Sequence, residues 1–174
     1  MKKKIFFLVF SFLLISTFVY ATGDQMPPQP KLSAEFERMK ALVGTWEGSS
    51  TEPDGRTNPA KAEYSLSSAG SVLVEKLFAG TPNEMTSIYH DTNGKFGMTH
   101  YCAIGNHPEL ALQGVSGNVY EFALAPVNSI AEGEPHMHDL KVEFKDVDTI
   151  VQTWTYYVGG QPQGSTMIQL KRAK

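Results

Sequence analysis

The chain has 174 residues, of which 41% are hydrophobic and 19% charged, so it is long enough for one compact core and too short for two domains of usual size. Fifteen Lys and Arg against 18 Asp and Glu give a formal net charge of −3. This balance disfavours a nucleic-acid binder, because such proteins need a basic surface to neutralise phosphates. The single cysteine, Cys102, excludes an internal disulfide framework and a cysteine-rich zinc module.

The first 21 residues have the pattern of a secretory signal peptide. Lysines at positions 2–4 precede an almost wholly apolar run over residues 5–19, and Ala21 is a small residue at the expected cleavage position. The run is shorter than the roughly 20 residues that a membrane-spanning helix needs, and an uncleaved anchor is the alternative. We therefore expect an exported protein, periplasmic or extracellular, whose mature chain has no integral membrane segment.

A proline-rich linker is predicted over residues 22–32, followed by a single domain over residues 33–174. The domain begins with a short helix, because Ser33 can cap its N-terminus and apolar residues recur at helical spacing. Gly44 ends this helix. Its apolar face comprises Phe36, Met39, Leu42 and Val43.

From residue 45 onward the pattern changes to short β-rich runs separated by turn residues. We predict ten strands near residues 45–51, 60–67, 71–78, 84–90, 95–102, 109–114, 119–124, 136–144, 149–157 and 165–171. Asn93-Gly94 is the clearest hairpin turn, since both residues tolerate a positive φ. Short connections require antiparallel neighbours, and closure removes the two exposed sheet edges. The sequence therefore predicts an up-and-down antiparallel β-barrel, with an open two-sheet sandwich as the alternative.

The alternation of side chains within each strand predicts which residues face the interior. In residues 136–145 one face would carry the charged residues, and the other would carry His136, His138, Leu140, Val142 and Phe144. In residues 95–102 the inward set would be Phe96, Met98, His100 and Cys102. A single bulge would reverse the assignment beyond it.

Three inward histidines would need hydrogen-bond partners, because an unsatisfied buried polar group costs about 1–3 kcal/mol. Such partners could be water, tyrosine or backbone groups at a barrel mouth, a bound small molecule, or a metal or haem. The candidate metal ligands are His100, His136 and His138. The predicted cavity residues are these three histidines together with Phe96, Met98, Cys102, Leu140, Val142, Phe144, Glu84 and Trp154. No catalytic residue is predicted.

Several short segments, spread over most of the predicted domain, are informative when they are considered together. They are Leu42-Val43-Gly44-Thr45-Trp46-Glu47-Gly48, Gly80-Thr81-Pro82 with Glu84-Met85, Tyr89-His90-Asp91, Thr99-His100-Tyr101-Cys102, Gly105-Asn106 with Pro108, and His136-Met137-His138. This pattern resembles exported bacterial lipocalin-like proteins of unknown function, the group known as domain of unknown function 1579 and its relatives. The resemblance implies a calycin-type β-barrel and brings with it no established reaction, cofactor or catalytic residue. His107 stands where the group has Gln.

The leading hypothesis is an exported β-barrel that binds a small, largely apolar molecule in its interior without turnover. The alternative is a metal- or haem-binding barrel, possibly an enzyme, that uses the same histidines. In a third interpretation the interior is only a packed core and the protein acts through its surface.

Overall fold

The structure, a computed structural model, describes residues 31–92 and 94–174. In these ranges the chain forms helix α1 (Ala34–Met39), a 3₁₀ turn (Lys40–Leu42), a second 3₁₀ turn (Ser68–Gly70) and ten strands. The strands are β1 (Gly44–Thr51), β2 (Thr57–Ser67), β3 (Val72–Leu77), β4 (Met85–Thr92), β5 (Lys95–Tyr101), β6 (Glu109–Ser116), β7 (Val119–Leu124), β8 (His136–Phe144), β9 (Thr149–Val158) and β10 (Gln161–Arg172).

The strands form a closed antiparallel barrel in simple succession, and β10 pairs with β1 to complete it. This confirms the predicted up-and-down barrel and excludes the open sandwich. Every strand predicted from the sequence is present; β7 and β8 have the predicted ends, and each of the other strands is shifted at one or both ends. The largest shift is in β10, which starts at Gln161 rather than near residue 165, because pairing with β9 continues through a bulge between Pro162 and Gly164.

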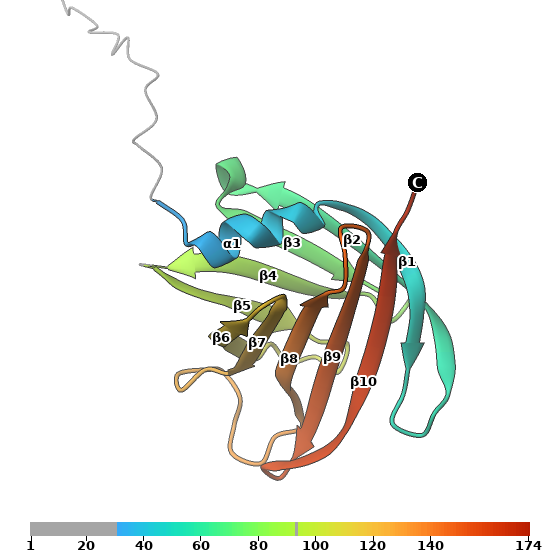
Figure 1. The fold of residues 1–174 in the computed structure, drawn as a ribbon. Helices are drawn as coiled ribbons and strands as arrows, with labels where there is room; N and C mark the ends of the chain where they lie inside the picture. The colour runs from blue at the N-terminus through green and yellow to red at the C-terminus, as the bar shows by residue number, and fades with distance from the viewer. Residues whose placement is uncertain (1–30, 93) are drawn as a thin grey trace, which may run out of the picture. The chain divides into compact units, whose positions relative to one another are not determined.

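Consecutive connections alternate between the two ends of an up-and-down barrel. One end, which we call the loop end, carries the connections 52–56, 78–84, 102–108, 125–135 and 159–160. The opposite end, which we call the helix end, is covered by α1 (Figure 1). Two contacts place α1 there: the Ser33 backbone N–H donates to Asp91 at the end of β4, and Arg38 donates to the Gly117 carbonyl in the β6–β7 turn.

The helix end is closed by apolar side chains. Ser33 caps α1 by accepting a hydrogen bond from the Phe36 N–H, as predicted, and Phe36, Met39 and Leu42 are fully buried. Trp46 lies beneath the helix and donates its indole N–H to the Leu42 carbonyl at 2.7 Å. Val43 was predicted on the same apolar face, but it follows the 3₁₀ turn in an extended conformation and is exposed.

Some predicted features lie outside the described residues. They are the signal peptide (residues 1–21), all but the last two residues of the linker, and Asn93. The β4–β5 turn is nevertheless tight, because Thr92 pairs with Lys95 and Gly94 has a φ of 75°. Among the helices that the structure describes, none has the length and apolar character to cross a membrane.

Candidate functional site

A row of polar side chains crosses four neighbouring strands on the inner face of the barrel. Tyr64 on β2 pairs with Glu75 on β3, Glu75 with Ser87 on β4, and Ser87 with His100 on β5. Directly opposed residues of antiparallel strands project to the same face, and all four side chains are buried. We call this row, with Gln152 and Trp154 of β9, the polar belt.

The carboxylate of Glu75 lies at the centre of the polar belt and is 0% exposed. Tyr64 donates its hydroxyl to Oε1 at 2.6 Å, Tyr89 donates to Oε2 at 3.0 Å, and the Gln152 amide donates to Oε1. Trp154 in turn donates its indole N–H to Gln152 Oε1 at 2.9 Å. Burial, followed by the nearby Glu75 carboxylate, holds the pKa of both tyrosines above the usual value, so both stay protonated donors.

His100 lies at the loop-end side of the belt and is 1% exposed. Its Nδ1 is 3.0 Å from Ser87 Oγ, and its ring packs against Trp154 of β9 with 4.4 Å between ring centroids. Because β5 and β9 are not neighbours, this contact spans the interior of the barrel. Burial lowers the pKa of His100 to about 4, so the ring is neutral at physiological pH. Its Nε2 has no hydrogen-bond partner in the described part of the chain.

The other predicted inner residues of β5, β8 and β9 are mainly apolar packing groups. Met98, Leu140 and Val142 are essentially fully buried, Phe96 and Trp154 are nearly so, and Phe144 packs against the same core at partial exposure. Phe96 stacks edge-on against Phe36 of α1, so it belongs to the closed helix end rather than to the loop end.

His136 and His138 do not share the face of Leu140 and Val142, and this prediction is wrong. Leu140 pairs with Trp154, but the register shifts between Met137 and Asp139, and His136 pairs with Tyr157. Tyr157 lies three residues from Trp154 on β9 and therefore projects to the opposite face. A β-bulge at His138 causes the reversal, because one extra residue in a strand inverts the side-chain alternation beyond it.

The two histidines instead form a cluster outside the barrel with Tyr157. The rings of His138 and Tyr157 stack with 4.0 Å between centroids, and His138 Nδ1 is 3.0 Å from Asp139 Oδ1. Burial and the Asp139 carboxylate raise the pKa of Tyr157. His136 is covered by the 125–135 connection, since its Nδ1–H donates to the Glu134 carbonyl at 2.7 Å. His100 thus lies apart from His136 and His138.

Glu84 also differs from the prediction, and Cys102 is less buried than predicted. Glu84 lies before β4, on the exposed 78–84 connection, where it accepts a hydrogen bond from the Gly80 N–H and pairs with Lys76 at 3.5 Å. It stabilises that turn rather than lining the interior. Cys102 lies just beyond β5 and is only partly buried, with its Sγ 3.9 Å from Met85 Sδ. No group of three or more potential metal ligands occurs in residues 31–92 and 94–174.

A hollow of about 350 Å³ opens at the loop end beside β1 and β2. It is lined by Ser50, Glu52, Asn58, Pro59, Phe78, Thr81 and Asn83, and we call it the mouth hollow. Ser50 pairs with Ile168, which pairs with Gln152 of the polar belt, so Ser50 lies on the inner face. It is 1% exposed, and its Oγ has no hydrogen-bond partner in the described ranges.

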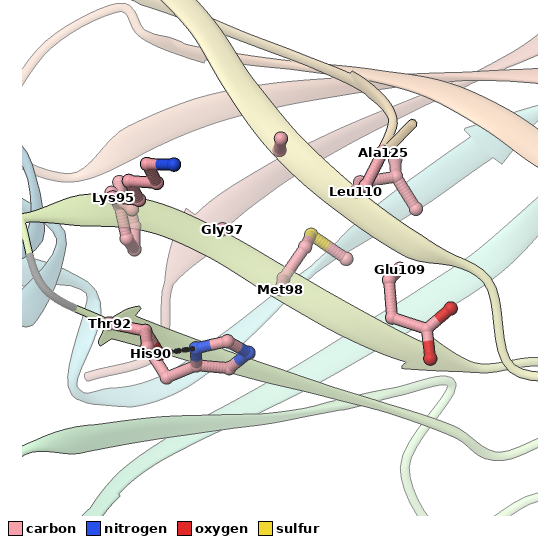
Figure 2. A pocket seen from close by; sticks show the side chains of 10 residues that line it. His90, Thr92, Lys95, Gly97, Met98, Glu109, Leu110 and Ala125 are labelled. Carbon is pink, nitrogen blue, oxygen red and sulfur yellow. Dashed lines mark hydrogen bonds between the residues drawn. The ribbon is translucent and has the colours of Figure 1, made fainter. Parts of the chain in front are cut away.

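A second hollow, of about 390 Å³, lies over strands β4 to β6 (Figure 2). Gly97 lies between Lys95 and Glu109 there, and His90 Nδ1 is 3.2 Å from Thr92 Oγ1. A Cβ at Gly97 would come within 2.7 Å of the Leu110 carbonyl oxygen, so this glycine allows the two strands to approach. The polar side chains that line this hollow lie on the outer face of the sheet. They share the face of Gly97, which alternates with Met98 and therefore lies on the face opposite His100.

Sequence reasoning missed most of the polar belt. Glu75 alternates with Leu73 and Leu77, so the same alternation that selected His100 would have placed this carboxylate inside. The hydrogen bonds to Tyr64, Tyr89 and Gln152 join residues from 11 to 77 positions away from Glu75 in sequence, and no local pattern predicts them.

Comparisons with known proteins support the fold only. No protein-family model matches the chain, and no curated protein matches it either. A crystal structure of a protein of unknown function from the DUF3598 family of Nostoc punctiforme is similar, with a TM-score of 0.54 and 14% sequence identity. The alignment covers 78% of this chain and 49% of that protein, so this chain spans about half of its length. The closed barrel of this chain and its similarity to the DUF3598 structure together fit a family of β-barrel proteins of unknown function.

Proposed function

We propose that this protein binds a small, largely apolar molecule at the loop end of its barrel, without chemical turnover. The supporting observation is that two polar atoms buried on inner-face positions at this end, Ser50 Oγ and His100 Nε2, lack hydrogen-bond partners among the described residues. Each such atom costs about 1–3 kcal/mol if it stays unsatisfied, and a ligand that contacts it recovers that cost. Barrel mouths are also a common location of small-molecule sites.

The mouth hollow is where this molecule would enter, and its volume of about 350 Å³ is within the usual range for ligand pockets. Phe78 supplies an aromatic wall. It has a φ of 55°, a left-handed conformation that is strained for a bulky residue and often marks a functional position. We also propose that residues 1–21 direct export of the protein. A relationship to the lipocalin-like proteins of unknown function is part of the same proposal.

Native mass spectrometry of the purified protein, followed by denaturing extraction, tests whether an organic molecule is bound. A titration with N-phenyl-1-naphthylamine, an uncharged apolar fluorescent probe, tests where it binds. We expect saturable binding that Asn58→Trp weakens at least tenfold, because the indole fills the mouth hollow. Thr57→Trp is the matched control, since Thr57 is the neighbouring residue on the opposite face of β2.

The proposal fails if the protein neither carries a molecule nor binds the probe. It also fails at this location if Asn58→Trp and Thr57→Trp bind the probe as tightly as the unaltered protein.

A further inference from the structure

The charges around the barrel interior limit the chemistry of its ligand. The buried polar and charged side chains on the inner face of the described strands are Ser50, Glu75, Ser87, His100 and Gln152, whereas the buried His136 lies outside the barrel. This set contains no lysine or arginine. Glu75 is its one carboxylate, and Glu52 adds a second carboxylate in the wall of the mouth hollow. An anionic ligand would therefore lose its hydration without gaining a cationic partner, which is strongly unfavourable.

Only part of this carboxylate charge is open to a cationic ligand, because Glu52 at the mouth keeps acceptor positions whereas Glu75 in the interior does not. Glu75 already accepts hydrogen bonds from two tyrosine hydroxyls and the Gln152 amide. Glu52 accepts a hydrogen bond from Thr166 at 2.8 Å. On the inner face of the described strands, the polar atoms without partners are instead the Ser50 hydroxyl and an imidazole nitrogen of His100, and both suit a neutral polar group; the other two such atoms, Asn106 Oδ1 and His136 Nε2, lie off this face.

The hydrogen bond at Ser87 decides which role His100 Nε2 can play. A serine hydroxyl has one proton to donate, and the side-chain partner of Ser87 is Nδ1 of His100. When the hydroxyl donates to Nδ1, the proton of the neutral imidazole is on Nε2. The group without a partner is then an N–H donor, and its complement is a hydrogen-bond acceptor.

We infer that Ser87 donates to Nδ1 of His100, and that the ligand is an uncharged molecule with an apolar, ring-shaped or flat body and one carbonyl or ether oxygen, which accepts a hydrogen bond from His100 Nε2–H. The flat body suits the aromatic ring of Phe78 in the wall of the mouth hollow. This inference depends on the proposed function, because it specifies the ligand of the same site.

Four naphthalenes of matched shape test this inference on the unaltered protein: 2-acetylnaphthalene, 2-ethylnaphthalene, 2-naphthoate and 2-naphthylmethylammonium. Their dissociation constants can be measured by isothermal titration calorimetry at pH 7. We expect the ketone to bind about tenfold more tightly than the hydrocarbon, as one net hydrogen bond would give. The carboxylate and the ammonium ion should bind more weakly than the ketone by a larger factor.

His100→Phe should abolish the advantage of the ketone over the hydrocarbon, because phenylalanine keeps the ring and removes the donor. His90→Phe, on the outer face of β4, is the control and should preserve it. Tighter binding of either ion, or equal binding of ketone and hydrocarbon by the unaltered protein, would overturn this inference alone. If none of the four probes binds, the proposed function fails as well.

Discussion

At the scale of single residues, the most unusual group is a carboxylate in the middle of an apolar barrel. Glu75 is stable there because two tyrosine hydroxyls and one amide surround it, so its acceptor positions are satisfied without a cation. The donors depend on Glu75 in the same way. Removing it would leave three buried donor groups with fewer partners.

We expect Glu75→Leu to lower the free energy of unfolding by about 3–5 kcal/mol, since orphaned buried donors each cost about 1–3 kcal/mol. Glu75→Gln keeps an acceptor and should cost less. Urea unfolding at pH 7 measures both. Glu121→Leu is the control, because Glu121 is exposed in a surface pair with Lys141 and should change stability by less than about 1 kcal/mol. A Glu75→Leu protein as stable as that control would contradict the buried network.

His100 makes stability depend on pH. Burial lowers its pKa to about 4, whereas an unfolded chain protonates histidine near about 6.5. Between these values the unfolded state binds more protons, so stability is lost as pH falls through this window.

From pH 7 to about 4.5 we expect His100 to contribute a loss of about 2–3 kcal/mol. Urea unfolding of the unaltered protein and of His100→Phe at both pH values isolates this contribution, because the effects of acidic groups are common to the two proteins. Equal losses in the two proteins would show that His100 does not protonate in this range.

At the scale of secondary-structure elements, one bulge decides which face of β8 meets the core. Met137 packs against the core, whereas His138, the next residue, stacks on Tyr157 outside it. Regular alternation from Leu140 would have reversed these two positions. The bulge therefore places His136 and His138 outside the candidate site and turns Met137 towards the core.

Alanine substitutions at these two positions test the bulge. We expect Met137→Ala to lower the free energy of unfolding by about 2 kcal/mol, the low end for core methionines because Met137 is partly buried, and His138→Ala by less than about 1 kcal/mol. Chemical denaturation of both variants provides the comparison. The opposite order would mean that β8 alternates regularly.

At the scale of the whole molecule, the barrel has one closed end and one end with polar atoms available. Phe36, Met39 and Leu42 cover the helix end, and Phe36 contacts Phe96 within the barrel at 5.7 Å between ring centroids. The loop end has the mouth hollow, Ser50 and His100. This asymmetry is why we place the proposed site there.

We expect Phe36→Ala to lower the free energy of unfolding by about 3–5 kcal/mol, the usual cost of removing a buried phenylalanine ring. Glu37→Ala, an exposed change on the same helix, is the control. Thermal unfolding followed by circular dichroism measures both. If both variants have the same melting temperature as the unaltered protein, α1 does not contribute to the closure of the barrel.

The sequence alone was enough to predict the fold. Ten β-rich runs, the short connections between them and a capped helix at the start are local patterns, and antiparallel succession with closure follows from them. The inner positions of β5, including His100, also follow from simple alternation, because the strand has no bulge there. Glu75 could have been found in the same way from its alternation with Leu73 and Leu77.

Only the tertiary structure decided the composition of the candidate site. The bulge at His138 depends on how β8 pairs with β9, and residues 136–138 themselves show no local mark of it. The partners of Glu75 come from strands on different sides of the barrel, and His100 meets Trp154 across the interior. Local periodicity reports the repeat of one strand, whereas register and contacts across the barrel arise only when all ten strands close together.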